Sequence, residues 1–388
     1  MKTIGSSVSR NSVLTINLLL AMALLLAACG KPPEAPARNA QGADAKPAAA
    51  ASTPTGTLNL YNWNNYIAPE TVERFEKQFN AKVQQTYFSD NDELLAKLAA
   101  GATGYDIMVP TSNALEILIK KGDLARLDPA KLPNLKNVKP EFLNTPFDPG
   151  NVYSVPYAYS TTVLGYNDRK LQGAGIEVRG TEVIFEPQIA CKLKGRITVL
   201  DSPDEVFSAA FIYLGIDPNT RASDDYRRAA ELIKKAKPCW AAFNSSSYIK
   251  EMSAGNIWLA LGYSVDFFQA NQDAAAAKQS FKIVAVVPRQ GAVLSVDNTV
   301  IHKAAPNPDL AHAFINFMLD GQNGSELTNL IGSGSANAAA IPFVKPEIAA
   351  DPSIFPDPAT VKKLSQLQLL PSDLRLERGR LWTEIKVK

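Results

Sequence analysis

Short apolar strand patterns alternate with amphipathic helix patterns from Leu58 onwards, and this alternation restricts the fold more than any other feature of the sequence. Residues 58–61 alternate apolar and polar side chains as a short strand does, and Pro69 begins a helical pattern. Residues 82–87 and 105–109 repeat the strand pattern, and a helix signal follows each of them. The alternation predicts an α/β fold with a mixed, mostly parallel sheet flanked by helices.

Two extended segments indicate that the chain crosses between two such α/β units. Residues 152–167 are rich in Pro, Tyr and Thr, which favours an extended crossover, and a second α/β run follows them. Residues 281–287 are extended again and could carry the chain back, so that 293–301 would complete the first unit. Two crossovers between two lobes predict a hinged clamp. We expect lobe 1 to comprise 58–160 and 288–345, lobe 2 to comprise 161–287, and 346–388 to form a helical tail that packs on a lobe.

The N-terminus has the properties of an export signal. Lys2 and Arg10 make it basic, and the apolar stretch 14–28 is too short for a stable membrane span. Small residues directly precede Cys29, which resembles the lipobox of bacterial lipoproteins, where this Cys carries the lipid; the alternative is a cleavable signal whose Cys is incidental. Residues 29–57 contain scarcely a large apolar side chain, so we expect a disordered tether. These features predict signal peptide 1–28 and a protein anchored in the cell envelope through Cys29.

Charge and cysteine content restrict the partners and the compartment. The chain has 40 basic and 38 acidic residues, so its net charge requires neither nucleic acid nor a membrane surface as partner. Export places Cys191 and Cys239 in an oxidising compartment, where they could form one disulfide; the alternative is two free buried thiols.

The sequence carries few residues suited to catalysis. Its only histidines are His302 and His312, and neither has a Cys or a second His at the spacing of metal ligands. It contains no nucleophile elbow, no phosphate-binding glycine loop and no zinc-protease motif. We therefore expect no enzyme activity, no metal site and no cofactor.

Acidic and aromatic side chains recur instead where predicted strands end. In an open α/β sheet these ends form the ligand-binding edge. Carboxylates there would attract a cation, and an aromatic face would cover its methylene chain through cation–π and apolar contact. An alkyl diamine or a longer polyamine would suit this set, although single acids at helix starts also stabilise helices without any ligand. The residues concerned are Trp63, Tyr66, Glu205, Tyr263, Asp266 and Asp297.

Seven motifs, in order along the chain, resemble those of the bacterial putrescine- and spermidine-binding proteins of ABC importers. The resemblance covers nearly all of the sequence from Leu58 to the end. The motifs are Tyr61-Asn-Trp-Asn-Asn-Tyr-Ile-Ala-Pro69, Gly104-Tyr-Asp-Ile-Met-Val-Pro110, Val155-Pro-Tyr157 with Gly165-Tyr-Asn167, Asp201-Ser-Pro-Asp-Glu-Val206, Tyr213-Leu-Gly, Gly262-Tyr-Ser-Val-Asp266 and Arg380-Leu-Trp-Thr-Glu-Ile-Lys386.

This resemblance implies a two-lobed periplasmic binding protein, monomeric, that closes on a polyamine and presents it to a membrane permease. It implies roles for individual residues as well. Trp63 and Tyr66 would stack on the polymethylene chain, Thr111 would hydrogen-bond near a terminal ammonium, and Glu205, Asp266 and Asp297 would meet the charged nitrogens.

The sequence departs from the family pattern within the expected pocket. Asn65 stands where an acid is common, Tyr263 stands where the aromatic is often Trp, and Ser295 and Ser335 stand where putrescine binders have aromatics. Fewer aromatic faces and one charge fewer leave three functions open. The first is polyamine capture for import, the second is a clamp for another cationic amine or amino metabolite, and the third is a sensory or surface-interaction lipoprotein that does not feed transport.

Overall fold

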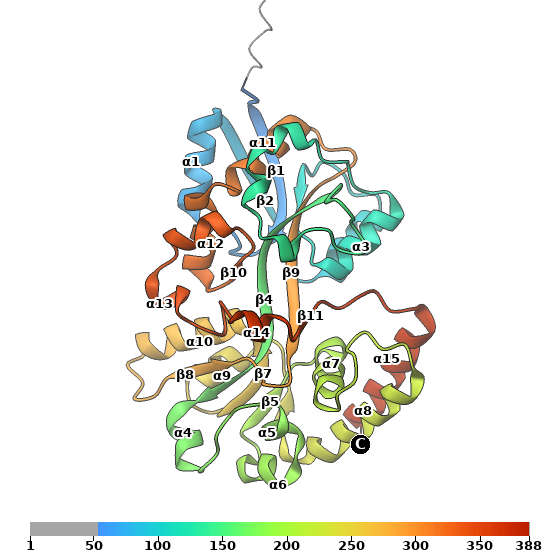
Figure 1. The fold of residues 1–388 in the computed structure, drawn as a ribbon, viewed down its shortest axis with the longest axis vertical. Helices are drawn as coiled ribbons and strands as arrows, with labels where there is room; N and C mark the ends of the chain where they lie inside the picture. The colour runs from blue at the N-terminus through green and yellow to red at the C-terminus, as the bar shows by residue number, and fades with distance from the viewer. Residues whose placement is uncertain (1–52, 388) are drawn as a thin grey trace, which may run out of the picture. The chain divides into compact units, whose positions relative to one another are not determined.

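The computed structural model describes residues 53–387 (Figure 1). The predicted signal peptide, Cys29 and most of the predicted tether lie outside the described residues. The first strand, β1 (Gly56–Trp63), is followed by α1 (Pro69–Phe79) and β2 (Ala81–Phe88). β1 pairs in parallel with β2 on one side and with β3 (Ile107–Met108) on the other. These strands are the centre of the first lobe.

Local capping signals mark where one helix of the first lobe begins and where the next one ends. α2 (Asn91–Ala99) begins after Asp90, whose carboxylate accepts a 2.8 Å hydrogen bond from the Glu93 amide. α3 (Ser112–Lys121) ends at Gly122, whose φ of 69° lies in the left-handed region that glycine adopts without steric cost. Asp90 thus caps the start of α2, and Gly122 ends α3.

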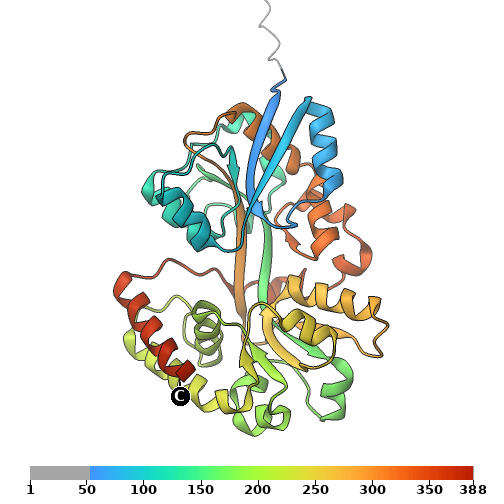
Figure 2. The same cartoon turned by 180° about the vertical axis from the view of Figure 1, so that it is seen from behind.

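Two long antiparallel strands connect the lobes (Figures 1 and 2). They are β4 (Ser154–Asn167) and β9 (Ala292–Ile301). The first half of β4 pairs with β9, and its second half pairs with β7 (Leu259–Tyr263) and β8 (Ile283–Val286). The expectation that 281–287 carries the chain back is therefore wrong. That segment forms β8, which hydrogen-bonds along the second half of β4 and stays in the second lobe, and β9 makes the return crossing.

The second lobe repeats the strand–helix arrangement. β5 (Ile197–Val199) pairs in parallel with β6 (Ala242–Phe243) and β7. Helix α7 (Pro203–Tyr213) follows β5, and α10 (Ser264–Ala276) follows β7 directly. Strand pairing is parallel around β1 and β5 and antiparallel where β4 and β9 join the sheet, in the order β2-β1-β3-β9-β4-β7-β5-β6. This mixed sheet with flanking helices confirms the predicted fold class.

The remaining elements are helices that cover the sheet, with two short strands. The helices are α4 (Asp168–Gly173), α5 (Glu182–Phe185), α6 (Pro187–Ala190), α8 (Ser223–Ala236), α9 (Tyr248–Ser253), α11 (Pro308–Met318), α12 (Gly321–Ile331), α13 (Pro346–Ala349), α14 (Pro358–Val361) and α15 (Ser372–Val387), with short 3-10 turns at Pro129–Lys131, Pro133–Asn137, Pro140–Phe142, Cys191–Leu193, Lys237–Cys239 and Ala338–Phe343, and the strands are β10 (Gly334–Ser335) and β11 (Leu364–Ser365).

Separate hydrophobic cores hold the two lobes. In the first, Leu58, Leu60 and Phe75 pack with buried residues of α11. In the second, buried side chains of α7 and α8 pack with Leu381 and Trp382 of α15. The chain reaches α15 by passing β9, where β11 pairs with the first residues of β9 (Figure 1). The C-terminal helix is thus part of the second core, although the preceding segment comes from the first lobe.

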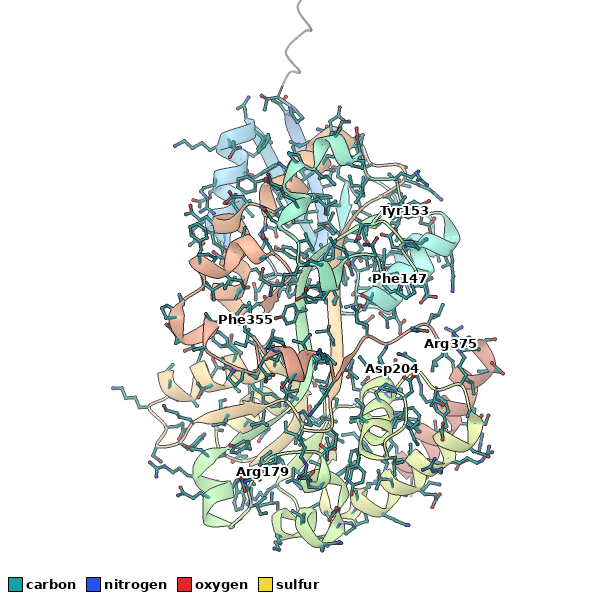
Figure 3. The ribbon with its side chains drawn as sticks, viewed as in Figure 1. Phe147, Tyr153, Arg179, Asp204, Phe355 and Arg375 are labelled. Carbon is teal, nitrogen blue, oxygen red and sulfur yellow. A yellow bond between two sulfur atoms is a disulfide. The ribbon has the colours of Figure 1, made fainter. Side chains whose placement is uncertain are left out.

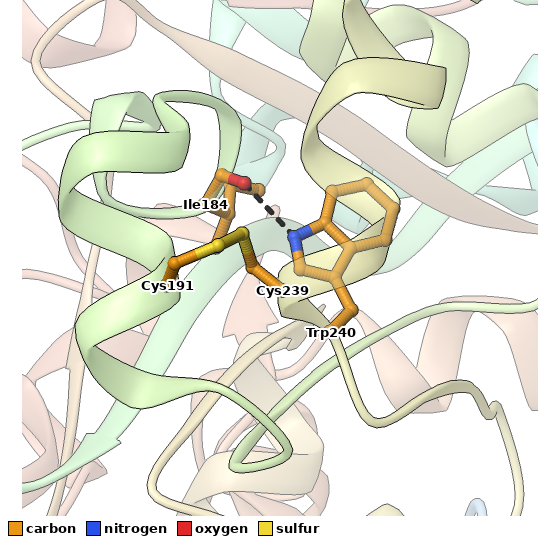
Figure 4. The surroundings of a disulfide bond; sticks show 4 residues. All are labelled: Ile184, Cys191, Cys239 and Trp240. Carbon is orange, nitrogen blue, oxygen red and sulfur yellow. Dashed lines mark hydrogen bonds between the residues drawn. A yellow bond between two sulfur atoms is a disulfide. The ribbon is translucent and has the colours of Figure 1, made fainter.

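Cys191 and Cys239 form a disulfide, which confirms the first of the two alternatives for these residues (Figure 4). Their Cα atoms lie 4.6 Å apart. The neighbouring Trp240 is buried, and its indole Nε1 donates a 2.9 Å hydrogen bond to the carbonyl oxygen of Ile184. The disulfide therefore ties the end of α6 to the end of α8, with Cys239 buried and Cys191 exposed.

Candidate ligand-binding site

The turn after β1 places one aromatic side chain against the core of the first lobe. Trp63 is half-buried, its ring lies 4.5 Å from that of Phe88, and its Nε1 donates a 2.9 Å hydrogen bond to the Val109 carbonyl oxygen. Asn62 holds the turn, because its side chain accepts from the Trp63 amide and donates to the Tyr66 carbonyl oxygen. Asn65 is exposed with φ of 56°, a conformation that Asn adopts more readily than most residues. In this structure the backbone of Asn65 forms part of the turn, and its side chain makes no hydrogen bond to any other described residue.

Tyr66 points from the same turn to Asp297 on β9. Its hydroxyl donates a 2.5 Å hydrogen bond to Asp297 Oδ2. Tyr157, from β4, donates its hydroxyl to the Tyr66 carbonyl oxygen, and the two rings meet edge to face. Asp297 is 6 % exposed, and burial raises the pKa of its carboxyl to about 7, against the lowering effect of the Tyr66 hydrogen bond. Its other oxygen, Oδ1, is buried and has no hydrogen-bond partner within residues 53–387.

Thr111 lies beside this carboxylate at the start of α3. Its backbone forms an isolated antiparallel bridge with Asp297, so the two residues are direct neighbours. Its hydroxyl interacts with the side chains of Asn91 and Asn113. Thr111 precedes α3, but its side chain makes no capping hydrogen bond to that helix. Its position is therefore compatible with the predicted role of binding near a ligand.

The second lobe contributes two acids from the first turns of helices. Glu205 lies in the first turn of α7 and accepts a 2.6 Å hydrogen bond from the Thr162 hydroxyl. Burial raises the pKa of Glu205 to about 7, with the Thr162 hydrogen bond acting in the opposite direction. Asp266 lies in the first turn of α10 and accepts a hydrogen bond from the Tyr248 hydroxyl. Burial raises the pKa of Asp266 too, and the Tyr248 hydrogen bond lowers it.

Tyr263, at the end of β7, brings these groups together. Burial raises the pKa of its phenol well above the usual value, and the negative charges of Glu205, Asp266, Asp204 and Asp297 raise it further. The charges of four carboxylates therefore act on one phenol, and one of them, Asp297, belongs to β9. Asp204, which precedes Glu205, is labelled beside α7 in Figure 3. Contacts tie two of the predicted acids to Tyr263: the Tyr248 hydroxyl bonds both Asp266 and the Tyr263 amide, and Thr162, which bonds Glu205, pairs with Tyr263 across β4 and β7.

Ser295 lies on β9 and Ser335 on β10, and both strands pair with β4. Ser295 pairs across β4 with Ser160 and is half-buried. Ser335 is 2 % exposed, and its hydroxyl both donates to the Asn337 carbonyl oxygen and accepts from the Asn337 amide. Ser335 therefore closes a backbone turn, which is an ordinary structural use of a serine. As ligand-binding residues, both serines remain predictions.

The electrostatics of the site favour a cation. None of the ion pairs within the described chain includes Glu205, Asp266 or Asp297, and their partners are neutral hydroxyls. A buried carboxylate without a counter-ion is costly, and a bound ammonium group would offset that cost. Among residues 53–387 no group of His, Cys, Asp and Glu has the arrangement of a metal site. Within the same range, no helix is long and apolar enough to cross a membrane.

Three hydroxyl residues of this arrangement are absent from the predicted set: Tyr157, Thr162 and Tyr248. Tyr157 belongs to the Val155-Pro-Tyr157 motif, so the sequence carried a signal for Tyr157 in that motif. Thr162 and Tyr248 are distant in sequence from the acids that they contact, by 43 and 18 residues. Only the pairing of β4 with β7 and the packing of α9 against α10 bring them to the site.

Comparison with known proteins places the chain in a family. The family model described as bacterial extracellular solute-binding protein matches residues 70–356. A putrescine/cadaverine-binding protein of Pseudomonas aeruginosa is 52 % identical over 340 residues, covering 88 % of this chain and 96 % of the relative. The putrescine-binding periplasmic protein PotF of Escherichia coli is 37 % identical and covers 85 % of this chain and 91 % of its own.

A solved structure agrees with these sequence matches. The spermidine/putrescine ABC transporter substrate-binding protein PotD of Streptococcus pneumoniae superimposes with a TM-score of 0.77 at 27 % identity, covering 86 % of this chain and 99 % of PotD. The matched lengths include both lobes and both hinge strands. The chain belongs to the bacterial extracellular solute-binding proteins.

Proposed function

We propose that this protein captures a polyamine of the putrescine or cadaverine type outside the cytoplasm and delivers it to an ABC permease. The observation that carries the proposal is the state of three carboxylates, the buried Glu205 and Asp297 and the half-buried Asp266, which have hydroxyl partners and no cationic partner among the described residues. A diamine supplies two ammonium groups joined by an apolar chain, which matches acids contributed from β9 and from the second lobe, with aromatic side chains between them. The names of the relatives point to the same ligand class.

Within this proposal the predicted residues keep their roles. Trp63 and Tyr66 would cover the methylene chain, Asp297 would receive one ammonium through its free Oδ1, and Glu205 and Asp266 would receive the other. Tyr66 acquires a second role, because its hydroxyl already holds Oδ2 of Asp297. Asn65, Ser295 and Ser335 would shape the pocket without adding charge.

Thermal unfolding with and without ligand tests the proposal. The exported chain carrying Cys29→Ser keeps every described residue and is free of lipid. Putrescine, cadaverine, spermidine and agmatine are added to it, with 1,4-butanediol as a control that has the carbon chain of putrescine and no charge. We expect at least one amine to stabilise the fold, by about 2.7 kcal/mol at 100 times its Kd, and the diol to have no effect. Absence of any shift at millimolar amine would rule out polyamine binding.

We further propose that the mature chain is a lipoprotein held in the envelope by Cys29, with the lobes divided as expected from the sequence. The tether would run from Cys29 to the start of β1; the expected end at residue 57 is corrected, because β1 begins at Gly56. Support comes from the lipobox-like residues before Cys29 and from the structural likeness to the TpPotD lipoprotein of Treponema pallidum, with a TM-score of 0.75 at 27 % identity. Mass spectrometry of the N-terminal peptide tests the anchor. A diacylglycerol mass on Cys29 is expected, and it should be absent in Cys29→Ser, whereas an unmodified Cys29 would exclude the lipoprotein form.

A further inference from the structure

Each acid of the candidate site receives one hydroxyl hydrogen bond, and each hydroxyl comes from a different element. Tyr66 donates to Asp297, Thr162 donates to Glu205, and Tyr248 donates to Asp266. A cationic partner would neutralise these carboxylates, whereas a hydroxyl leaves the negative charge in place for a ligand. Tyr66 is already a predicted site residue, but Thr162 and Tyr248 are not.

The direction of the Tyr248 proton is set by its surroundings. Tyr248 is 1 % exposed, and its hydroxyl oxygen accepts a 3.2 Å hydrogen bond from the Tyr263 amide. Since a phenol has only one proton to donate, that proton is directed to Asp266. The same hydroxyl thus fixes the end of β7, where Tyr263 lies, and the carboxylate in the first turn of α10.

Two glycines make the space that Tyr248 needs. A Cβ on Gly262 would lie 2.5 Å from the Tyr248 hydroxyl oxygen, and a Cβ on Gly165 would lie 2.1 Å from the ring of Phe267. Phe267 packs edge to face against Tyr248 at 5.9 Å. Both glycines open motifs of the sequence analysis, Gly262-Tyr-Ser-Val-Asp266 and Gly165-Tyr-Asn167. Their absence of a side chain lets the two rings pack and brings the phenol to Asp266.

Strand register places Thr162 next to Tyr263, which also contacts Tyr248. Thr162 on β4 pairs directly with Tyr263 on β7, and it is 4 % exposed. Its hydroxyl lies 2.6 Å from Glu205 Oε2. The two hydroxyl donors therefore flank Tyr263, and each holds one oxygen of the carboxylate next to it.

We propose that Tyr248 and Thr162 are positioning residues of the ligand site, which favour the ionised forms of Asp266 and Glu205 and turn the free oxygen of each toward the amine. This inference rests on the proposed function. A hydrogen bond to the charged form of an acid favours that form, and this effect opposes the burial of both carboxylates. Asp204 is the charged group that acts on Glu205, and it is itself paired with Arg378 of α15, while Tyr248 is the titratable group that bonds Asp266.

Substitutions that remove only the hydroxyl test the inference. Tyr248→Phe and Thr162→Val take away the donor and keep the shape, and Thr162→Ser restores it. Tyr213→Phe is the matched control, because the Tyr213 hydroxyl donates to Glu186 at 2.9 Å, outside the site. Putrescine affinity is measured by calorimetry between pH 5.5 and 8.5. We expect Tyr248→Phe and Thr162→Val to weaken binding by about tenfold or more at pH 6 and by less as the pH rises. Thr162→Ser and Tyr213→Phe should follow the wild type.

A second measurement does not need a ligand. Carboxyl carbon NMR titrations of the ligand-free protein report the ionisation of Asp266 and Glu205 directly. We expect Tyr248→Phe to raise the midpoint of Asp266 and Thr162→Val to raise that of Glu205, with Tyr213→Phe changing neither. Unchanged midpoints, or a loss of putrescine affinity that is equal at every pH, would overturn the positioning role. A wild-type protein that binds no polyamine would instead overturn the proposed function and leave the titration as the decisive test.

Discussion

The Tyr66 hydroxyl donates a 2.5 Å hydrogen bond to Asp297 Oδ2 and so joins the turn after β1 to a hinge strand 231 residues further along the chain. Tyr157 of the other hinge strand supports this pair through the Tyr66 carbonyl oxygen. The pair leaves Asp297 Oδ1 without a partner among the described residues, in a buried position. An acid held in this way is prepared for a ligand that brings a positive charge.

Asp297→Asn should abolish most of the amine affinity. The substitution keeps the size of the side chain and removes the charge, and breaking a buried charge pair between protein and ligand typically costs about 2 to 5 kcal/mol. Calorimetry with putrescine measures the effect. Asp90→Asn is the control, because Asp90 caps α2 and Asn is an equally good cap. Equal losses in the two variants would mean that Asp297 has a structural role only.

The stability of the ligand-free protein should respond to pH through Asp297 and Glu205. Both have a folded-state pKa of about 7, above the ordinary value near 4 of the unfolded chain, because burial disfavours the charged form. Between these pH values the folded state holds more protons than the unfolded state. These two acids therefore favour the fold below about pH 4, and this contribution is lost as the pH rises to about 7.

The double variant Asp297→Asn with Glu205→Gln isolates this contribution. Denaturant unfolding at pH 5, 6, 7 and 8 should show the variant gaining stability relative to the wild type as the pH rises, by about 1.4 kcal/mol for each pH unit and each acid between the two pKa values. Other acids titrate equally in both proteins and cancel in the difference. A difference that is constant from pH 5 to 8 would contradict the raised pKa values.

Trp63→Phe should weaken amine binding without unfolding the first lobe. Phe keeps the contact with Phe88 but loses the hydrogen bond to the Val109 carbonyl oxygen, and its ring attracts a cation less strongly. We expect a loss of about 0.5 to 2 kcal/mol in binding free energy by calorimetry. Trp258→Phe is the control, since Trp258 packs against Lys170 and Arg196 in the second lobe. The hypothesis fails if Trp63→Phe binds as the wild type does.

Removal of the disulfide should lower stability and leave affinity unchanged. Cys191 and Cys239 close a loop across 48 positions in the second lobe, and loss of such a bond typically costs about 2 to 5 kcal/mol. Scanning calorimetry compares the wild type with the variant that carries Ser at both positions. A reductant should lower the wild-type Tm to that of the variant and have no effect on the variant. A large change in putrescine affinity would show that the bond also shapes the site.

Much of the fold was predictable because its signals are local. The α/β class, the caps at Asp90 and Gly122, and the bounds of α8 at Ser223 and Ala236 all follow from periodicity and capping within a few residues. The predictions of a solute-binding protein and of a chain without enzyme activity are confirmed by the family match and the 52 % identical relative. The one misplaced segment, 281–287, has the same extended pattern whether it crosses between lobes or pairs within one, and only its partner strand distinguishes the two.

For the candidate site, the sequence by itself determined the types of residue and their places at strand ends and helix starts: Trp63 at the end of β1, Glu205 after β5, Asp266 after β7. What only the tertiary structure decided is the environment of each acid. The pairing of Thr162 with Glu205, of Tyr248 with Asp266 and of Tyr66 with Asp297 depends on contacts between elements that are distant in the sequence. The physical reason is that ionisation of a buried carboxylate is set by desolvation and by neighbours in space, and no local sequence pattern encodes either of them.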